Sequence, residues 1–140
     1  MSVKIEHIEW PDRPDCVMPY SPANKVTGGS LLFFAGVTAA PVYHSHPHIP
    51  AEFDQIPPDM ATQARMTMEN LKKSLDAVGA TFANVVVANR FLTDLSQQDV
   101  LNKIWNKYVG DNKPTTTTVQ VVKLATDPRC LVEINAIAVI

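Results

Sequence analysis

The chain has 140 residues, of which 46% are hydrophobic and 19% are charged, and its formal net charge is −2. This length and composition predict one ordinary domain over residues 1–140, able to bury a core without metal or disulfide staples. The slightly acidic balance gives no attraction to a polyanion, so the composition argues against nucleic-acid binding.

The first expected elements are strands. Residues 3–8 alternate between polar and apolar side chains and are predicted to form an edge strand. Residues 24–27 and 30–37 flank Gly28-Gly29, which predicts a hairpin. The second arm of this hairpin is apolar at almost every position, so we expect it to be covered on both faces.

Two helices are expected in the middle of the chain, on either side of a valine-rich strand over residues 82–92. The first helix begins after Asp59 and ends at Gly79, and the second begins near Ser96 and ends at Gly110. A 3-4 spacing gives the first helix one apolar stripe. The stripe consists of Ala61, Ala64, Met68, Leu71, Leu75 and Val78.

The last two expected strands cover residues 115–123 and 130–140. The order of elements predicts an α+β fold, a two-layer sandwich in which a mixed six-stranded sheet carries two helices on one face. Alternation places Thr116 and Thr118 on one face of the first of these strands, and Glu133 on one face of the second. We expect both polar faces on the sheet surface away from the helices. That surface either meets solvent or forms a cleft against another subunit. The opposite face of the last strand, from Cys130 to Ala138, is small and apolar enough to lie under the helices.

The sequence shows no pattern typical of a secretion signal, a membrane-spanning helix or a structural metal site. The first residues lack an apolar signal core, and no run approaches the roughly 18 apolar residues that a membrane helix needs. Cys16 and Cys130 have no metal-binding spacing. We therefore expect a cytoplasmic protein with two free thiols, no membrane contact and no cofactor.

Several segments carry a family resemblance over nearly the whole chain. They are Pro19-Tyr20-Ser21-Pro22-Ala23, Leu32-Phe33-Phe34-Ala35-Gly36, Ala64-Arg65 through Asn70-Leu71, Phe91-Leu92-Thr93-Asp94-Leu95, Asn102, and the closing strand around Glu133. In this order and spacing they resemble the Rid family, the YjgF-type reactive-intermediate deaminases, which are also described as endoribonuclease L-PSP-like.

The resemblance implies a chorismate-mutase-like fold and a homotrimer that binds small molecules in clefts between subunits. It also implies hydrolysis of an imine or enamine to a carbonyl compound and ammonia. Carried onto this chain, Glu133 would handle the water, and Tyr20, Gly36 and Asn102 would line the substrate site. A desolvated cleft would raise the pKa of Glu133 and suit it to general acid/base work, whereas the alternative is an exposed strand residue.

One position departs from the family pattern. The family carries an arginine that grips a substrate carboxylate, and this chain has Thr116 there, with Thr118 in place of a frequent cysteine. Threonine cannot form the charge-assisted pair, so affinity for a carboxylate should fall about tenfold or more. Arg90 and Arg129 are candidates for a compensating cation, although we expect each to be an exposed, solvated charge.

Three histidines, His44, His46 and His48, alternate within the proline-rich loop over residues 41–58. Three imidazoles are a known zinc set, but no carboxylate stands at a usual spacing, so we expect no metal site. Because the loop closely follows Gly36, we expect it to border the cleft. There the histidines would donate hydrogen bonds or hold an anion in place of the missing arginine.

These observations leave three functions open. The first is a Rid-like homotrimer that binds a small metabolite and hydrolyses an imine, an enamine or a related compound. The second is a ligand-binding or regulatory trimer without turnover. The third is a ribonuclease or translation inhibitor, which the acidic balance of the chain disfavours.

Overall fold

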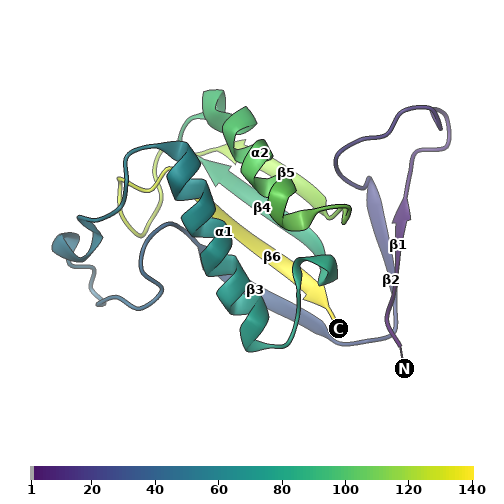
Figure 1. Ribbon diagram of the computed structural model, residues 1–140, viewed down its shortest axis with the longest axis horizontal. Coiled ribbons are helices and arrows are strands. Elements are labelled where there is room, and N and C mark those ends of the chain that lie inside the picture. The colour runs from purple at the N-terminus through teal and green to yellow at the C-terminus, as the bar shows by residue number, and fades with distance from the viewer. Residues whose placement is uncertain (1) are drawn as a thin grey trace.

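The computed structural model describes residues 2–140, and its described part confirms the α+β class (Figure 1). The strands are β1 (Lys4–Ile8), β2 (Ala23–Thr27), β3 (Leu31–Val37), β4 (Val85–Leu92), β5 (Thr115–Gln120) and β6 (Val132–Val139). The α-helices are α1 (Met60–Ala77) and α2 (Gln98–Val109). The short 3-10 helices are η1 (Pro50–Phe53), η2 (Phe82–Asn84) and η3 (Leu95–Gln97).

The six described strands form a mixed sheet and a separate ribbon. β3, β6, β4 and β5 lie side by side in that order, with β4 and β5 parallel and the other neighbours antiparallel. β1 and β2 pair with each other in an antiparallel ribbon, which stands beside the sheet in Figure 1. β3 and β5 are therefore the two edge strands of the sheet.

The predicted hairpin across Gly28-Gly29 is wrong, because β2 pairs with β1 and β3 pairs with β6. Both glycines have positive φ, 75° and 81°, a conformation that side chains rarely adopt. A Cβ at Gly29 would lie 2.4 Å from Val3 Cγ2 and 2.7 Å from the carbonyl oxygen of Ile140. Ser30 then exchanges backbone hydrogen bonds with Ile140 (2.6 and 3.1 Å). The two glycines thus carry the chain from the ribbon into the sheet.

Both α-helices cover the same face of the sheet (Figure 1). Asp59 caps α1 as predicted, since its Oδ2 accepts a 2.9 Å hydrogen bond from the backbone N–H of Thr62. Four members of the predicted apolar stripe, Ala64, Met68, Leu71 and Leu75, are buried against the sheet, whereas Ala61 is half-buried and Val78 is exposed. The main core contains Met60, Ala64, Met68, Leu71, Leu75, Ala88, Leu92, Leu101, Ile104, Trp105, Val132, Ile134, Ala136 and Ala138. The helix-facing side of the last strand is therefore small and apolar, as predicted.

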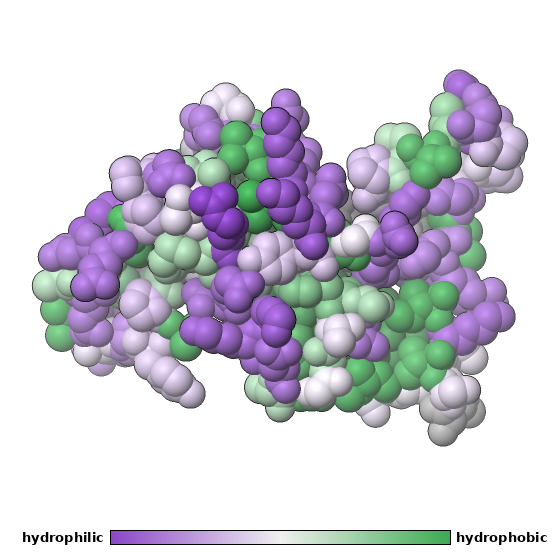
Figure 2. Space-filling view, viewed as in Figure 1, coloured by the Kyte–Doolittle hydropathy of each residue, from purple (hydrophilic) through white to green (hydrophobic). Residues whose placement is uncertain are grey.

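Among the described residues, neither α-helix covers the opposite face of the sheet, and only part of that face is packed, where Phe91 meets a second buried cluster. Phe33 is 73% exposed on this face and Val119 is 39% exposed, and both are large apolar side chains. Figure 2 shows the helix side, where hydrophilic atoms lie over the outer surfaces of α1 and α2. Neither α1 nor α2 combines the length and the apolar character that crossing a membrane requires.

Candidate functional site

A polar pocket of about 530 Å³ lies where α2 approaches β5, and we call it the β5–α2 pocket. It is lined by Pro19, Tyr20, Arg90, Gln98, Asn102, Trp105, Asn106, Thr116 and Thr118. Tyr20 reaches it because the ribbon is tied to the start of β5, where Ser21 N donates to the carbonyl of Pro114 at 3.4 Å. Tyr20, Asn102, Thr116, Thr118 and Arg90, which the sequence singled out, thus lie together.

The two threonines face the helices, which corrects the expected shared polar surface. In the parallel pairing of β4 and β5, Thr116 lies opposite Ala88, a core residue under the helices, and Thr118 lies opposite Arg90. Glu133 pairs with Phe91, whose side chain points to the other face. Polar side chains are tolerated on the helix side here because β5 is an edge strand, where the pocket keeps them partly solvated.

Arg90 is the most unexpected residue of the pocket. It is only 5% exposed, so the expectation of a solvated surface charge is wrong. Its Nε donates a 3.0 Å hydrogen bond to Thr118 Oγ1, and its guanidinium carbon lies 5.4 Å from the ring centroid of Trp105. Burial without a compensating charge lowers the pKa of Arg90 to about 10, which still leaves it protonated at neutral pH.

The terminal nitrogens of Arg90 are free to bind an anion. Among residues 2–140, Arg90 forms no ion pair with a carboxylate, and its hydrogen bond uses Nε alone. No polar side-chain atom in the described chain is both sealed from solvent and unpartnered. The two terminal nitrogens of Arg90 are therefore not completely sealed from solvent, and the β5–α2 pocket is the cavity that Arg90 lines.

Arg129, the other candidate cation, already uses its guanidinium donors in hydrogen bonds within the chain. Its Nε donates to Asp127 Oδ1, one terminal nitrogen donates to Asp54 Oδ1, and the other donates to the carbonyl of Pro50, each at 2.8 Å. These bonds tie the turn before β6 to the segment around η1. The guanidinium of Arg129 therefore stabilises the fold, and Arg90 is the better candidate for binding an anion.

Glu133 lies beside a β-bulge in β3, the edge strand farthest from β5. β3 carries a bulge between Phe34 and Val37, where an extra residue enters the strand. Gly36 sits in that bulge, and a Cβ there would come within 2.6 Å of Glu133 Oε2. The Glu133 carboxylate therefore packs directly against the backbone of Gly36, where no side chain intervenes. Burial raises the pKa of Glu133, as a desolvated acid/base group requires.

The histidine loop also approaches Gly36. A cavity of about 240 Å³ is lined by both Gly36 and His44, with Thr38, Asn70 and Ser74 among its other residues. His46 and His48 do not line this cavity. The structure thus places the candidate residues in two groups: the β5–α2 pocket at one edge of the sheet, and Gly36, Glu133 and His44 toward the other edge.

Sequence comparison identifies the family. The profile of the family described as Endoribonuclease L-PSP matches residues 11–140, nearly the whole chain. The chain belongs to the endoribonuclease L-PSP family. This L-PSP family chain is 36% identical over 126 residues to Protein DfrA of Myxococcus xanthus, covering 90% of this chain and 88% of that protein. It is 30% identical over 136 residues to TdcF of Escherichia coli, covering 94% and 95% of the two chains.

Solved structures agree with this assignment. RidA from the Antarctic bacterium Psychrobacter superposes with a TM-score of 0.65 at 28% identity, covering 96% of this chain and 99% of RidA. The Rid family protein YyfB from Yersinia pestis gives a TM-score of 0.74 over the full length of both chains, and at 24% identity it supports the fold alone. The resemblance to the Rid family predicted from the sequence is confirmed.

Three residues that line the β5–α2 pocket of this L-PSP family chain, Gln98, Trp105 and Asn106, were not predicted as site residues from the sequence. Gln98, Asn102 and Asn106 are spaced four residues apart on α2, so their amides form one polar stripe toward β5. Trp105, 4% exposed, closes the floor of the pocket next to this stripe. The regular spacing of three amides was the available signal, and only Asn102 was picked out, by its family match.

Proposed function

We propose that this chain is a Rid-type hydrolase that converts a small imine or enamine bearing a carboxylate into a carbonyl compound and ammonia. The observation that carries the proposal is the buried Arg90, whose terminal nitrogens are unpaired in a pocket that also holds Tyr20, Asn102, Thr116 and Thr118. A guanidinium recognises a carboxylate through two parallel hydrogen bonds. TdcF, a relative at 30% identity, bears a name that proposes a reactive intermediate deaminase.

Each residue has a role in this reaction. Arg90 holds the substrate carboxylate, in place of the family arginine that Thr116 replaces. Glu133 takes a proton from water as the water oxygen attacks the imine carbon. Glu133 returns this proton to the nitrogen, which gives a carbinolamine. Glu133 then takes the hydroxyl proton and passes it to the amino nitrogen, so the carbon–nitrogen bond breaks and ammonia leaves as the carbonyl forms. Burial raises the pKa of Glu133, which makes it a stronger base than an ordinary carboxylate and helps it both accept and return protons.

A homotrimer would join the two groups of residues. Within one chain, the β5–α2 pocket and Glu133 lie on opposite faces of the sheet. β3, with Gly36, and β5, with the threonines, form its opposite edges. A closed ring of three chains uses a heterologous interface, and in the proposed ring this interface joins the β5 edge of one protomer to the β3 edge of the next. The exposed Phe33 and Val119 support burial of the open face in such an assembly.

Complementation between two inactive variants tests this arrangement. Arg90→Ala and Glu133→Gln should each abolish ammonia release from 2-iminopropanoate generated in situ. In any mixed ring of the two chains, one site combines an intact Arg90 with an intact Glu133. Mixed trimers should therefore regain about one third of wild-type activity. Mixed trimers as inactive as the parents would refute a site shared between subunits.

A ligand-binding protein without turnover is the second candidate, favoured by the separation of Arg90 and Glu133 within one chain. In that case Arg90→Ala would lose affinity for a carboxylate ligand, while the wild type would release no ammonia from any imine or enamine supplied. The family description also refers to a ribonuclease. The chain's net charge of −2 argues against RNA binding. Cleavage of RNA by the pure protein, lost in Glu133→Gln, would be needed to support a ribonuclease.

A further inference from the structure

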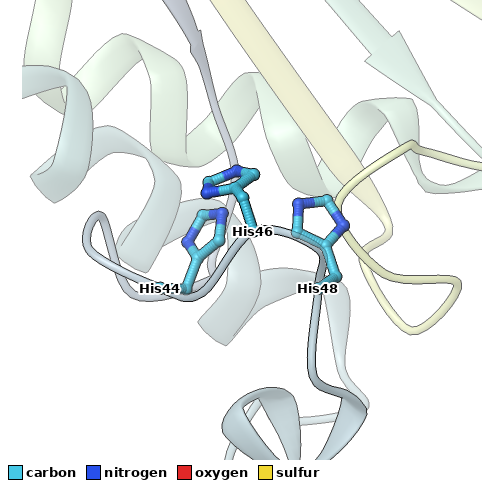
Figure 3. A group of neighbouring side chains, drawn as sticks. All are labelled: His44, His46 and His48. Carbon is cyan, nitrogen blue, oxygen red and sulfur yellow. The ribbon is translucent and has the colours of Figure 1, made fainter.

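Three imidazole rings converge at the surface, outside the pocket assigned above. Figure 3 shows the side chains of His44, His46 and His48 gathered at one bend of the loop. Their ring centroids lie 4.8, 4.9 and 5.2 Å apart. One potential ligand atom from each ring lies within 4.8 Å of the other two. Alternate residues of an extended chain are about 6.6 Å apart, so the bend brings the rings closer than an extended loop would.

The spacing of the nitrogens suits a tetrahedral metal ion after small side-chain rotations. Zinc–nitrogen bonds of about 2.0–2.1 Å place the nitrogens of a tetrahedral site about 3.4 Å apart. The ligand atoms lie within 4.8 Å of one another, so their separations exceed this value by at most about 1.4 Å. Rotation about the side-chain bonds of His46 and His48, both of which are exposed, can supply that movement without moving the backbone.

The ring of His44 is already oriented for a metal. Its Nδ1 lies 2.7 Å from the carbonyl oxygen of Pro41. A carbonyl can only accept a hydrogen bond, so Nδ1 carries the proton and Nε2 keeps its lone pair. Metal-binding histidines commonly donate their second ring nitrogen to a backbone carbonyl in this way, which fixes the tautomer and the ring orientation.

Two further contacts hold the loop in place. The rings of His44 and His48 pack edge-on against Phe53, at 5.3 and 5.7 Å between centroids, and Phe53 is only 1% exposed. The backbone N–H of Ser45 donates a 3.1 Å hydrogen bond to Glu52 Oε2. The histidines are therefore supported by the core and by a neighbouring helical turn, which lowers the conformational cost of binding.

The charges around the cluster favour a cation over an anion. Glu52 lies beside the loop and, among the described residues, forms no ion pair with lysine or arginine. Asp127 lies near His48 and is neutralised by Arg129 at 2.8 Å. Three imidazole rings beside a carboxylate that no lysine or arginine neutralises therefore suit a metal cation better than an anion.

We propose that His44, His46 and His48 form a binding site for a divalent transition-metal ion, Zn²⁺ in the first instance. Three nitrogen ligands leave a fourth position for water, and imidazole ligands suit zinc, copper and nickel better than magnesium or calcium. The site is independent of the hydrolase function proposed above, since Arg90, Thr116 and Glu133 take no part in it.

Calorimetric titration of untagged protein with Zn²⁺ tests the proposal. We expect one Zn²⁺ per chain, and affinity reduced by about tenfold or more in His46→Ala and in His48→Ala, at least the loss seen for outer-shell partners. His7→Gln is the matched control, because His7 is the remaining histidine and pairs with Asn24 and Ser21 on the ribbon. This control should bind Zn²⁺ as the wild type does.

A second measurement does not depend on the variants folding. Co²⁺ added to the wild type should give the visible absorption of a low-symmetry nitrogen-ligated site, and Zn²⁺ should abolish it by displacement. Zn²⁺ affinity that is unchanged in a His46→Ala/His48→Ala double variant would overturn the proposal. So would a Co²⁺ spectrum identical to that of the ion in water.

Discussion

The carboxylate of Glu133 occupies space that any side chain at position 36 would need. A Cβ on Gly36 would lie 2.6 Å from Glu133 Oε2 and 3.0 Å from its Cδ. Two residues from different strands are thus fitted to each other at the bulge of β3. This contact makes position 36 a probe of the carboxylate that avoids mutating the carboxylate itself.

Gly36→Ala should displace the Glu133 side chain and reduce ammonia release at least tenfold. The cost in folding stability should be small, because the clashing atoms belong to the flexible end of a side chain. A double-mutant cycle on the residual rate of ammonia release checks the cause: in a Glu133→Gln background, where only that low residual rate is left, Gly36→Ala should have almost no further effect. Equal losses in both backgrounds would show that Gly36 acts by another route.

The raised pKa of Glu133 predicts a dependence of stability on pH. Below about pH 4 the side chain is protonated in both the folded and unfolded states, so the wild type and Glu133→Gln should be similarly stable. As pH rises from the ordinary glutamate pKa through the raised pKa, Glu133 ionises in the unfolded state before it ionises in the folded state. The wild type should therefore lose stability relative to the variant over this range. Urea unfolding of both proteins at matched concentration, from about pH 4 to pH 8, measures this difference. A constant difference across that range would contradict the desolvated carboxylate.

Thr118→Val removes the oxygen that accepts the Arg90 Nε hydrogen bond while keeping the side-chain shape. A buried donor left without a partner costs about 1–3 kcal/mol, so the free energy of unfolding should fall by that amount. Thr27→Val is the control, because Thr27 is an exposed strand threonine on the ribbon, outside the sheet face assigned to the trimer, and should change stability by about 0.5 kcal/mol or less. If the two variants unfolded alike, Thr118 would not be supporting the guanidinium.

Thr116→Arg should rescue the inactive Arg90→Ala variant. Thr116 and Arg90 line the same pocket, so a guanidinium introduced at 116 can reach a carboxylate bound there. We expect at least a tenfold recovery of kcat/KM for a carboxylate substrate, and none for the corresponding methyl ester. Thr116→Gln, which is uncharged, is the control. Equal recovery with glutamine would argue against a charge-based anchor.

Much of this fold could be predicted because local patterns agree with it. The apolar stripe of α1, the Asp59 cap and the apolar face of β6 were each readable from spacing alone. The pairing of β2 was not, because two glycines fit a hairpin and a crossover between sheets equally well. Only the close approach of Val3 and Ile140 to Gly29, a contact between distant parts of the chain, decides between them.

The candidate site was harder to predict for a similar reason. Arginines are mostly exposed, so composition favoured a solvated Arg90. Its burial depends on Trp105 from α2 and Thr118 from β5, neither of which is near it in sequence. The face of Thr116 likewise depends on the register between β4 and β5, since alternation along one strand defines two faces without saying which one the helices cover.

The most direct test of the account is a crystal structure of the protein soaked with pyruvate, the product expected from 2-iminopropanoate. The account predicts the pyruvate carboxylate in the β5–α2 pocket, with both oxygens accepting hydrogen bonds from the terminal nitrogens of Arg90. Pyruvate bound elsewhere, or an Arg90 guanidinium that pairs with a carboxylate of the protein itself, would contradict it.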